Sequence, residues 1–126
     1  ISGMHDVMIL NTTRPAADRI RARRCTSFLC RLRGLTFRRQ IPRGWGLLLE
    51  QKRDSRVDAS ITMWFMFTDL AVVWINSAGE VVDVRLARRW RFAYFPRRPA
   101  CYALEMNTAH FDDFQIGDRV RFEEIL

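Results

Sequence analysis

The chain has 126 residues and a net charge of +7, with 20 arginines and one lysine. This length is typical of one domain, which buries roughly two-thirds of the surface that its unfolded chain exposes. The longest apolar run, residues 61–75, is interrupted by Thr62, Thr68 and Asp69 and is shorter than the ~20 residues of a membrane helix. The sequence therefore predicts one soluble cytoplasmic domain without a transmembrane segment, and a trimmed secreted form stays open.

Short apolar runs separated by turn residues predict a mainly β domain. Residues 7–10 and 20–22 predict two strands, and Thr26 or Ser27 is placed to cap a short helix that ends at Gly34. Further strands are expected at 47–49, 61–67, 72–75, 81–86, 100–106 and 119–125, with a polar loop at 50–58 and a hairpin turn at 76–79. A single helical turn is expected after Asn107 or Thr108.

These elements predict a compact antiparallel β-sandwich or a partly open barrel with one or two short helices. Residues 19–126 are expected to form the single domain. Residues 1–18 are expected to be an N-terminal extension, part of which need not be native sequence.

Basic and acidic residues are segregated along the chain. Residues 19–49 contain nine arginines and no acid, residues 84–104 contain six arginines and no acid, and the last 22 residues contain six acids. This distribution predicts a basic face and a more acidic side. The simpler interpretation is a solvated surface whose arginines pair with carboxylates brought near by folding. The alternative is an anion-binding face, because guanidinium groups bind phosphate and carboxylate alike.

Cysteine and histidine offer few candidates for catalysis or metal binding. The three cysteines, Cys25, Cys30 and Cys101, are odd in number and lack a Cys-x-x-Cys pair, which argues against a disulfide framework. Their spacing with His110 is not that of a structural zinc motif, and His5 is expected in a mobile tail. Phosphate-loop and zincin motifs are absent too, so the sequence favours a non-enzymatic protein with no catalytic residue, metal or cofactor.

Three segments in fixed order carry a family pattern. They are Arg31-Leu-Arg-Gly34-Leu35, Ile61-Thr-Met-Trp-Phe-Met66 continuing to Gly79, and Tyr102-Ala-Leu-Glu105 followed by Gly117-Asp118. The pattern resembles the uncharacterised prokaryotic family DUF192, which implies a small β-rich domain with no established activity. Ala71 departs from it, because the family usually carries aspartate there. Either that aspartate is structural, which we favour, or this member has lost the family's function.

The first candidate site is a polar cluster at the edge of the core. Arg31 and Glu105 each interrupt apolar surroundings within a family-like motif. With Arg38 and Met66 they predict a ligand-binding site in a small non-enzymatic module, whose partner is a small molecule or a protein.

The second candidate is non-specific binding of nucleic acid or another polyanion through an arginine-rich face. Its residues interleave cations with aromatic rings: Arg88, Arg89, Trp90, Arg91, Tyr94, Arg97 and Arg98. Packing of these rings over the sheet is the favoured interpretation, so nucleic acid is the second choice. Outward arginines beside exposed Trp90 and Tyr94 would favour it, whereas arginines buried against Glu105 and Asp118 would favour the ligand-binding module. The oligomeric state is not predicted.

Overall fold

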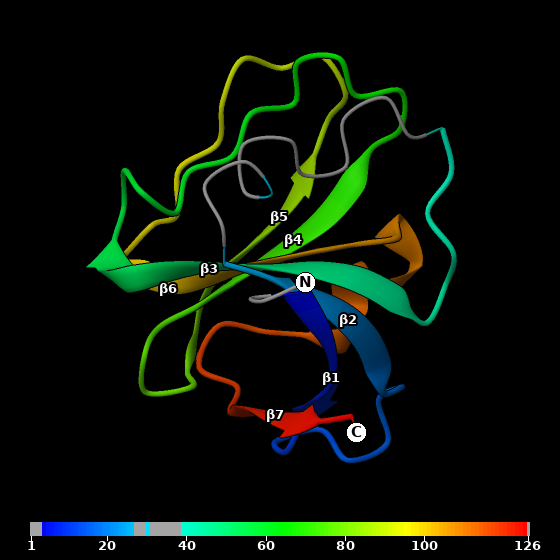
Figure 1. Ribbon diagram of the computed structural model, residues 1–126, viewed down its shortest axis with the longest axis vertical. Coiled ribbons are helices and arrows are strands. Elements are labelled where there is room, and N and C mark those ends of the chain that lie inside the picture. The colour runs from blue at the N-terminus through cyan, green and yellow to red at the C-terminus, as the bar shows by residue number, and fades with distance from the viewer. Residues whose placement is uncertain (1–3, 27–29, 31–38, 126) are drawn as a thin grey trace.

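The computed structural model describes residues 4–26, 30 and 39–125, which contain seven strands and one short 3₁₀ helix (Figure 1). The strands are β1 (Met4–Asn11), β2 (Ile20–Cys25), β3 (Trp45–Ser55), β4 (Leu70–Ile75), β5 (Val81–Ala87), β6 (Ala100–Met106) and β7 (Val120–Glu124). The helix η1 (Thr108–Asp113) lies between β6 and β7. The short helix predicted over residues 27–34 falls outside the described residues, except for Cys30.

The strands form one curled sheet in the order β5-β4-β6-β3-β2-β1-β7. Neighbouring strands are antiparallel except β2 and β3, which run parallel. A β bridge between Glu80 and Arg119 joins the starts of the two edge strands β5 and β7, so the sheet curls toward closure. The predicted mainly β fold is confirmed, and its form is a half-barrel.

An apolar core covers each face of the sheet. Side chains from β1 to β6 that point into the curl form one cluster, and Phe114 closes it after η1. The second cluster lies on the outer face, where Trp74 packs with Met63 and other side chains of the long connections. The Trp74 indole donates to the Ala59 carbonyl at 2.7 Å and so ties one connection to the sheet. All six residues of β4 are buried because both faces are covered.

The predicted hairpin turn and helix cap are confirmed. Gly79 adopts a φ of 83° in the β4–β5 turn, and its N–H donates to the Asn76 carbonyl at 3.0 Å. The side-chain oxygen of Asn76 also accepts the N–H of Ala78. At η1, the side chain of Asn107 accepts the N–H of Ala109 at 2.8 Å. These short-range hydrogen bonds follow from the residue types at each turn.

Residues 61–67 do not form the predicted strand. Ile61 makes an isolated bridge to Tyr94, and Phe65 has a φ of 60°, which interrupts an extended backbone. The prediction is wrong because the apolar side chains of this run lie in two different environments rather than in one covered sheet. Met63 and Met66 are buried in the outer core, whereas the three aromatic side chains of the run are exposed.

Two other segments differ from expectation. β3 continues through residues 50–55, predicted as a loop, because Ser55 still pairs with Ala100 beyond an irregularity in the register. Residues 4–11 form β1, which confirms the strand predicted over residues 7–10 and makes it longer. They pair with β2 on one side and β7 on the other, so this part of the predicted N-terminal extension lies within the sheet. His5 therefore lies in the sheet, with its ring 2.9 Å from the Glu124 carboxylate, and its placement in a mobile tail is wrong.

Candidate functional site

Two connections outside the sheet are hydrogen-bonded to each other. Ile61 and Tyr94 exchange both backbone hydrogen bonds, at 2.9 and 3.0 Å. Further along, the N–H of Trp90 donates to the Met63 carbonyl at 2.8 Å, and the N–H of Met63 donates to the Arg91 carbonyl at 3.2 Å. These bonds hold residues 61–67 and 88–95 side by side, as the green and yellow traces at the top of Figure 1 show. The pairing therefore fixes which side of each segment faces away from the sheet.

The outer side of this pair is aromatic and basic. Six large rings are exposed there, and Phe92 is the most exposed at 70%. Six exposed arginines belong to the same stretch of the chain, residues 85–98. We call this set the aromatic–arginine surface: Trp64, Phe65, Phe67, Trp90, Phe92 and Phe95 with Arg85, Arg88, Arg89, Arg91, Arg97 and Arg98. Exposed rings in such number mark an interaction site on a protein surface.

Ring contacts connect the two segments across this surface. Trp64 meets Phe92 with ring centroids 5.2 Å apart, and Trp90 meets both Phe65 and Phe67, at 5.5 and 5.9 Å. All three pairs are edge-on rather than stacked, an arrangement that aromatic quadrupoles favour. The rings therefore support one another while remaining about half exposed.

Phe65 and Trp90 have left-handed backbones, with φ values of 60° and 66°. This region is rare for bulky side chains, and each such residue costs about 1–3 kcal/mol. Backbone hydrogen bonds between the two segments offset this cost. Strained residues cluster at binding sites, where they hold side chains in the orientation that a ligand needs.

The carboxylates near this surface already accept hydrogen bonds from backbone N–H groups. Asp69 accepts the N–H of Arg89 at 2.9 Å, with the Arg89 side chain 3.6 Å away. Asp83 is buried, and its two oxygens accept the N–H groups of Val84 and Arg97. Arg85 lies 3.9 Å from Asp83. Within the described part of the chain, the other four arginines of the surface form no ion pair with a carboxylate: Arg88, Arg91, Arg97 and Arg98.

A shallow groove of about 560 Å³ opens at one end of the surface, beside β5. Its wall is fixed by Tyr94, whose hydroxyl oxygen accepts the N–H of Arg88 at 3.0 Å. The Arg85 guanidinium lies over the Tyr94 ring, 5.4 Å from its centroid. The groove is lined by Arg85, Arg91, Phe92, Ala93, Tyr94 and Phe95.

Glu105 lies elsewhere, in the middle of the sheet. It pairs with Leu47 of β3 and Val72 of β4, so its side chain shares the outer face with theirs. The side chain is buried, and its Oε1 has no hydrogen-bond partner among the residues that the structure describes. Burial raises the pKa of this carboxyl to about 7. Met66 is buried as well, and Arg31 and Arg38 lie outside the described residues, so the predicted four-residue cluster stays a prediction.

Ala71 points to the opposite face from Glu105. Its neighbours across the sheet are Met106 and Leu86, whereas the next residue, Val72, is the one opposite Glu105. Ala71 is fully buried in the inner core. An acid at this position would therefore lie inside the curl, on the face away from both Glu105 and the connections that carry the aromatic–arginine surface.

His110 is held by hydrogen bonds at both ring nitrogens. Nδ1 lies 2.8 Å from the Asp113 carboxylate, and Nε2 accepts the N–H of Gly44 at 3.3 Å. The proton therefore resides on Nδ1. A buried imidazole with both nitrogens engaged anchors η1 to the loop before β3.

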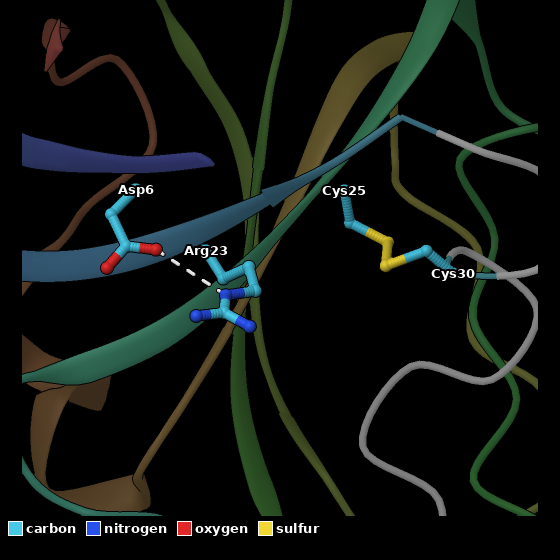
Figure 2. The surroundings of a disulfide bond; sticks show 4 residues. All are labelled: Asp6, Arg23, Cys25 and Cys30. Atoms are coloured by element: carbon cyan, nitrogen blue, oxygen red, sulfur yellow. Dashed lines mark hydrogen bonds and ion pairs between the residues drawn. A yellow bond between two sulfur atoms is a disulfide. The ribbon is translucent and has the colours of Figure 1, made fainter. Parts of the chain in front are cut away.

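Cys25 and Cys30 form a disulfide, with their Cα atoms 5.7 Å apart (Figure 2). The argument against disulfide bonding from the odd cysteine count is therefore wrong. The argument failed because an odd count only prevents all three cysteines from pairing. It does not prevent one bond between two cysteines that are close in the sequence, with the third cysteine left free. Cys101 is that free thiol, and it donates to the Gln51 carbonyl at 3.1 Å. Among the residues that the structure describes, no group of three or more His, Cys, Asp or Glu could hold a metal.

The structure brings together only part of what the sequence singled out. Trp90 and the arginines of residues 88–98 are exposed, and Tyr94 is half-buried, so packing over the sheet is the wrong interpretation for most of that segment. Sequence reasoning missed the rings of the partner segment, because it assigned Trp64, Phe65 and Phe67 to a covered strand. The available signal was three large rings within four positions that precede Thr68 and Asp69, in a chain already rich in arginine.

Known proteins share both the sequence pattern and the fold. The profile of the family DUF192, described as an uncharacterized ACR, matches residues 9–122. A UPF0127 protein of Pyrococcus furiosus is 33% identical over 120 residues, which cover 94% of this chain and 100% of that protein. Another UPF0127 protein, from Thermococcus kodakarensis, is 35% identical over 98 residues, which cover 78% of this chain but only 60% of the relative's length.

A crystal structure from Sinorhizobium meliloti, of a protein described as a "putative transcription regulator", has a TM-score of 0.80 at 21% identity. The match covers 94% of this chain and 93% of the other. At 21% identity, the likeness is evidence for a shared fold and for nothing further. In the described ranges, no helix has the length and apolar character needed to cross a membrane. Because the family profile spans nearly the whole chain, the protein belongs to the DUF192 family.

Proposed function

We propose that this domain is a non-enzymatic binding module and that its aromatic–arginine surface binds single-stranded nucleic acid without sequence preference. The observation that carries the proposal is the interleaving of exposed rings with six exposed arginines, four of which form no ion pair with the described residues. Bases stack on aromatic side chains, and phosphates accept hydrogen bonds from guanidinium groups. Both halves of the ligand therefore find matching groups on one surface.

The rings favour a single strand over a duplex. Each base stacked on an aromatic side chain contributes about 1–3 kcal/mol. In a duplex the faces of the bases are already stacked on one another, so only the phosphates remain for the protein. The described chain also presents no helix long enough to read a major groove, since η1 spans six residues.

The alternative ligand-binding site has less support. Glu105 and Met66 are buried rather than set in an open site. All six arginines of residues 84–104 are exposed. The buried Asp118 pairs with Arg14, which belongs to neither of the two acid-free arginine stretches. Exposed arginines beside an exposed Trp90 are the arrangement that favours nucleic acid.

The test is a titration of labelled single-stranded and duplex oligonucleotides of equal length, at ~50 and ~200 mM salt. We expect the single strand to bind at least about tenfold more tightly, and its affinity to fall at least about thirtyfold at the higher salt if four or five phosphates are engaged. The double variant Trp64→Ala/Phe92→Ala removes one ring pair and should weaken binding at least about tenfold. Ile116→Ala, an exposed apolar residue outside the surface, is the control and should bind like the parent protein.

Three results would contradict the proposal. Equal affinity for single strand and duplex, unaffected by the ring variant, would mean that general positive charge alone is responsible. Tight binding that survives the higher salt, or that depends on sequence, would contradict non-specific binding. Association with phosphatidylserine vesicles and not with oligonucleotides would assign the surface to a membrane.

A further inference from the structure

We infer that the groove beside β5 is a nucleotide subsite, in which one base lies against the aromatic wall and its phosphate binds Arg91 and Arg85. The inference rests on the proposed function and refines it, because it names where on the surface one unit of the strand is held. The groove is shallow, has a volume of about 560 Å³ and is lined by rings and arginines.

The wall of the groove is rigid before any ligand arrives. Tyr94 is fixed at its backbone by two hydrogen bonds to Ile61 and at its hydroxyl by the N–H of Arg88. Thr62 adds a hydrogen bond from its hydroxyl to the Phe92 carbonyl, at 2.8 Å. A preorganised wall loses little conformational entropy on binding, so most of the stacking energy contributes to affinity.

The charge of the groove selects an anion. Its lining contains two arginines and no acid. The nearest carboxylate, Asp83, is buried and already accepts two backbone N–H groups, and it lies 3.9 Å from Arg85. Arg91 forms no ion pair with the described residues and is therefore available to a phosphate. Arg85 lies over the Tyr94 ring and at the outer limit of an ion pair with Asp83, so a phosphate can share its guanidinium with that carboxylate.

The combination of rings and arginines identifies the chemical class of the ligand. Inorganic phosphate would make no use of three aromatic residues, and an uncharged aromatic ligand would make no use of two arginines. A planar ring joined to a phosphate by a short sugar uses both, which describes a nucleoside monophosphate or one unit of a single strand.

The experiment is a nuclear magnetic resonance titration of the full chain with adenosine monophosphate, adenosine and ribose 5-phosphate. We expect the monophosphate to bind at least about tenfold more tightly than either fragment, with shifts of the Tyr94 ring and the Arg91 side-chain N–H signals. Arg91→Gln should weaken it at least about tenfold, because a charge-assisted hydrogen bond is lost. Arg19→Gln is the control: this exposed arginine precedes β2, three strands from β5, and should leave the affinity unchanged.

Ribose 5-phosphate or adenosine binding as tightly as the monophosphate would overturn the subsite, and so would shifts confined to other regions. Equal losses in Arg91→Gln and Arg19→Gln would overturn it as well. A second variant, Phe92→Ala, removes an exposed ring without disturbing the core and should also weaken binding of the monophosphate.

The two proposals can fail independently of each other. Oligonucleotides that bind through Trp64 and Trp90 while the monophosphate does not would refute the subsite alone, and a bound monophosphate without oligonucleotide binding would refute the proposed function alone.

Discussion

Replacing Glu105 with glutamine should make the protein more stable at neutral and alkaline pH. Glu105 is 4% exposed, its Oε1 has no hydrogen-bond partner within the described ranges, and burial raises the pKa of the carboxyl from 4.5 to about 7. Ionising it in the folded state means placing a charge where neither water nor a described hydrogen-bond partner reaches Oε1. The amide has nearly the same shape and carries no charge, so it avoids this cost.

The size and sign of the effect follow from proton linkage. Between pH 4.5 and about 7 the folded protein holds a proton on Glu105 that the unfolded chain has lost. The free energy of unfolding therefore falls as pH rises through this window, and it levels off above it. The gap between 4.5 and about 7 corresponds to about 3 kcal/mol.

The assay is urea denaturation of the parent protein and Glu105→Gln between about pH 5 and 8. The stability difference in favour of the variant should grow by about 2.5 kcal/mol across this range, because part of the total effect is already present at pH 5. Glu123→Gln is the control, because it makes the same change from acid to amide at an exposed residue of β7, outside the core. A constant difference for Glu105→Gln, or one that shrinks as pH rises, would refute the reasoning and show that Glu105 has a charged partner.

Three further predictions concern stability. Gly46→Ala should destabilise the fold by about 1–3 kcal/mol in the same assay, because the added methyl would lie 3.0 Å from the Glu105 carbonyl oxygen; a loss under about 0.5 kcal/mol would contradict this. Trp74→Phe should cost about 2 kcal/mol, since it leaves the buried Ala59 carbonyl without its donor, and an unchanged urea midpoint would argue against that bond. Reduction of Cys25–Cys30 should lower stability by about 2 kcal/mol, and alkylation of the unfolded chain should label Cys101 alone before reduction; labelling of all three without reductant would contradict the disulfide.

The turns, caps and strand ends that depend on residues adjacent in the sequence could be predicted from it. The turn at Asn76–Gly79 and the cap at Asn107 are set by side chains that bond to their own backbone. β6 begins and ends where its apolar run does, at Ala100 and Met106. Local chemistry decides these elements, and tertiary contacts only reinforce them.

What could not be predicted depends on contacts between distant segments. Whether Trp64 and Phe65 are covered is decided by the pairing of residues 61–67 with 88–95, which no local pattern encodes. The burial of the Glu105 carboxyl is likewise a property of the packed sheet, since the sequence shows only an acid within an apolar strand. The Cys25–Cys30 bond is a local exception: it requires the two Cα atoms to be as close as 5.7 Å, a distance that a separation of five residues allows but does not fix.

Ultraviolet crosslinking of a single-stranded oligonucleotide, with the attached peptides identified by mass spectrometry, tests the central claim most directly. The account predicts crosslinks within residues 61–67 and 85–98, above all at the exposed Trp64, Trp90 and Phe92. It also predicts that the Trp64→Ala/Phe92→Ala variant loses most of the crosslinked product. Crosslinks concentrated on the arginines of β2 and β7, or distributed evenly over the basic residues, would contradict it.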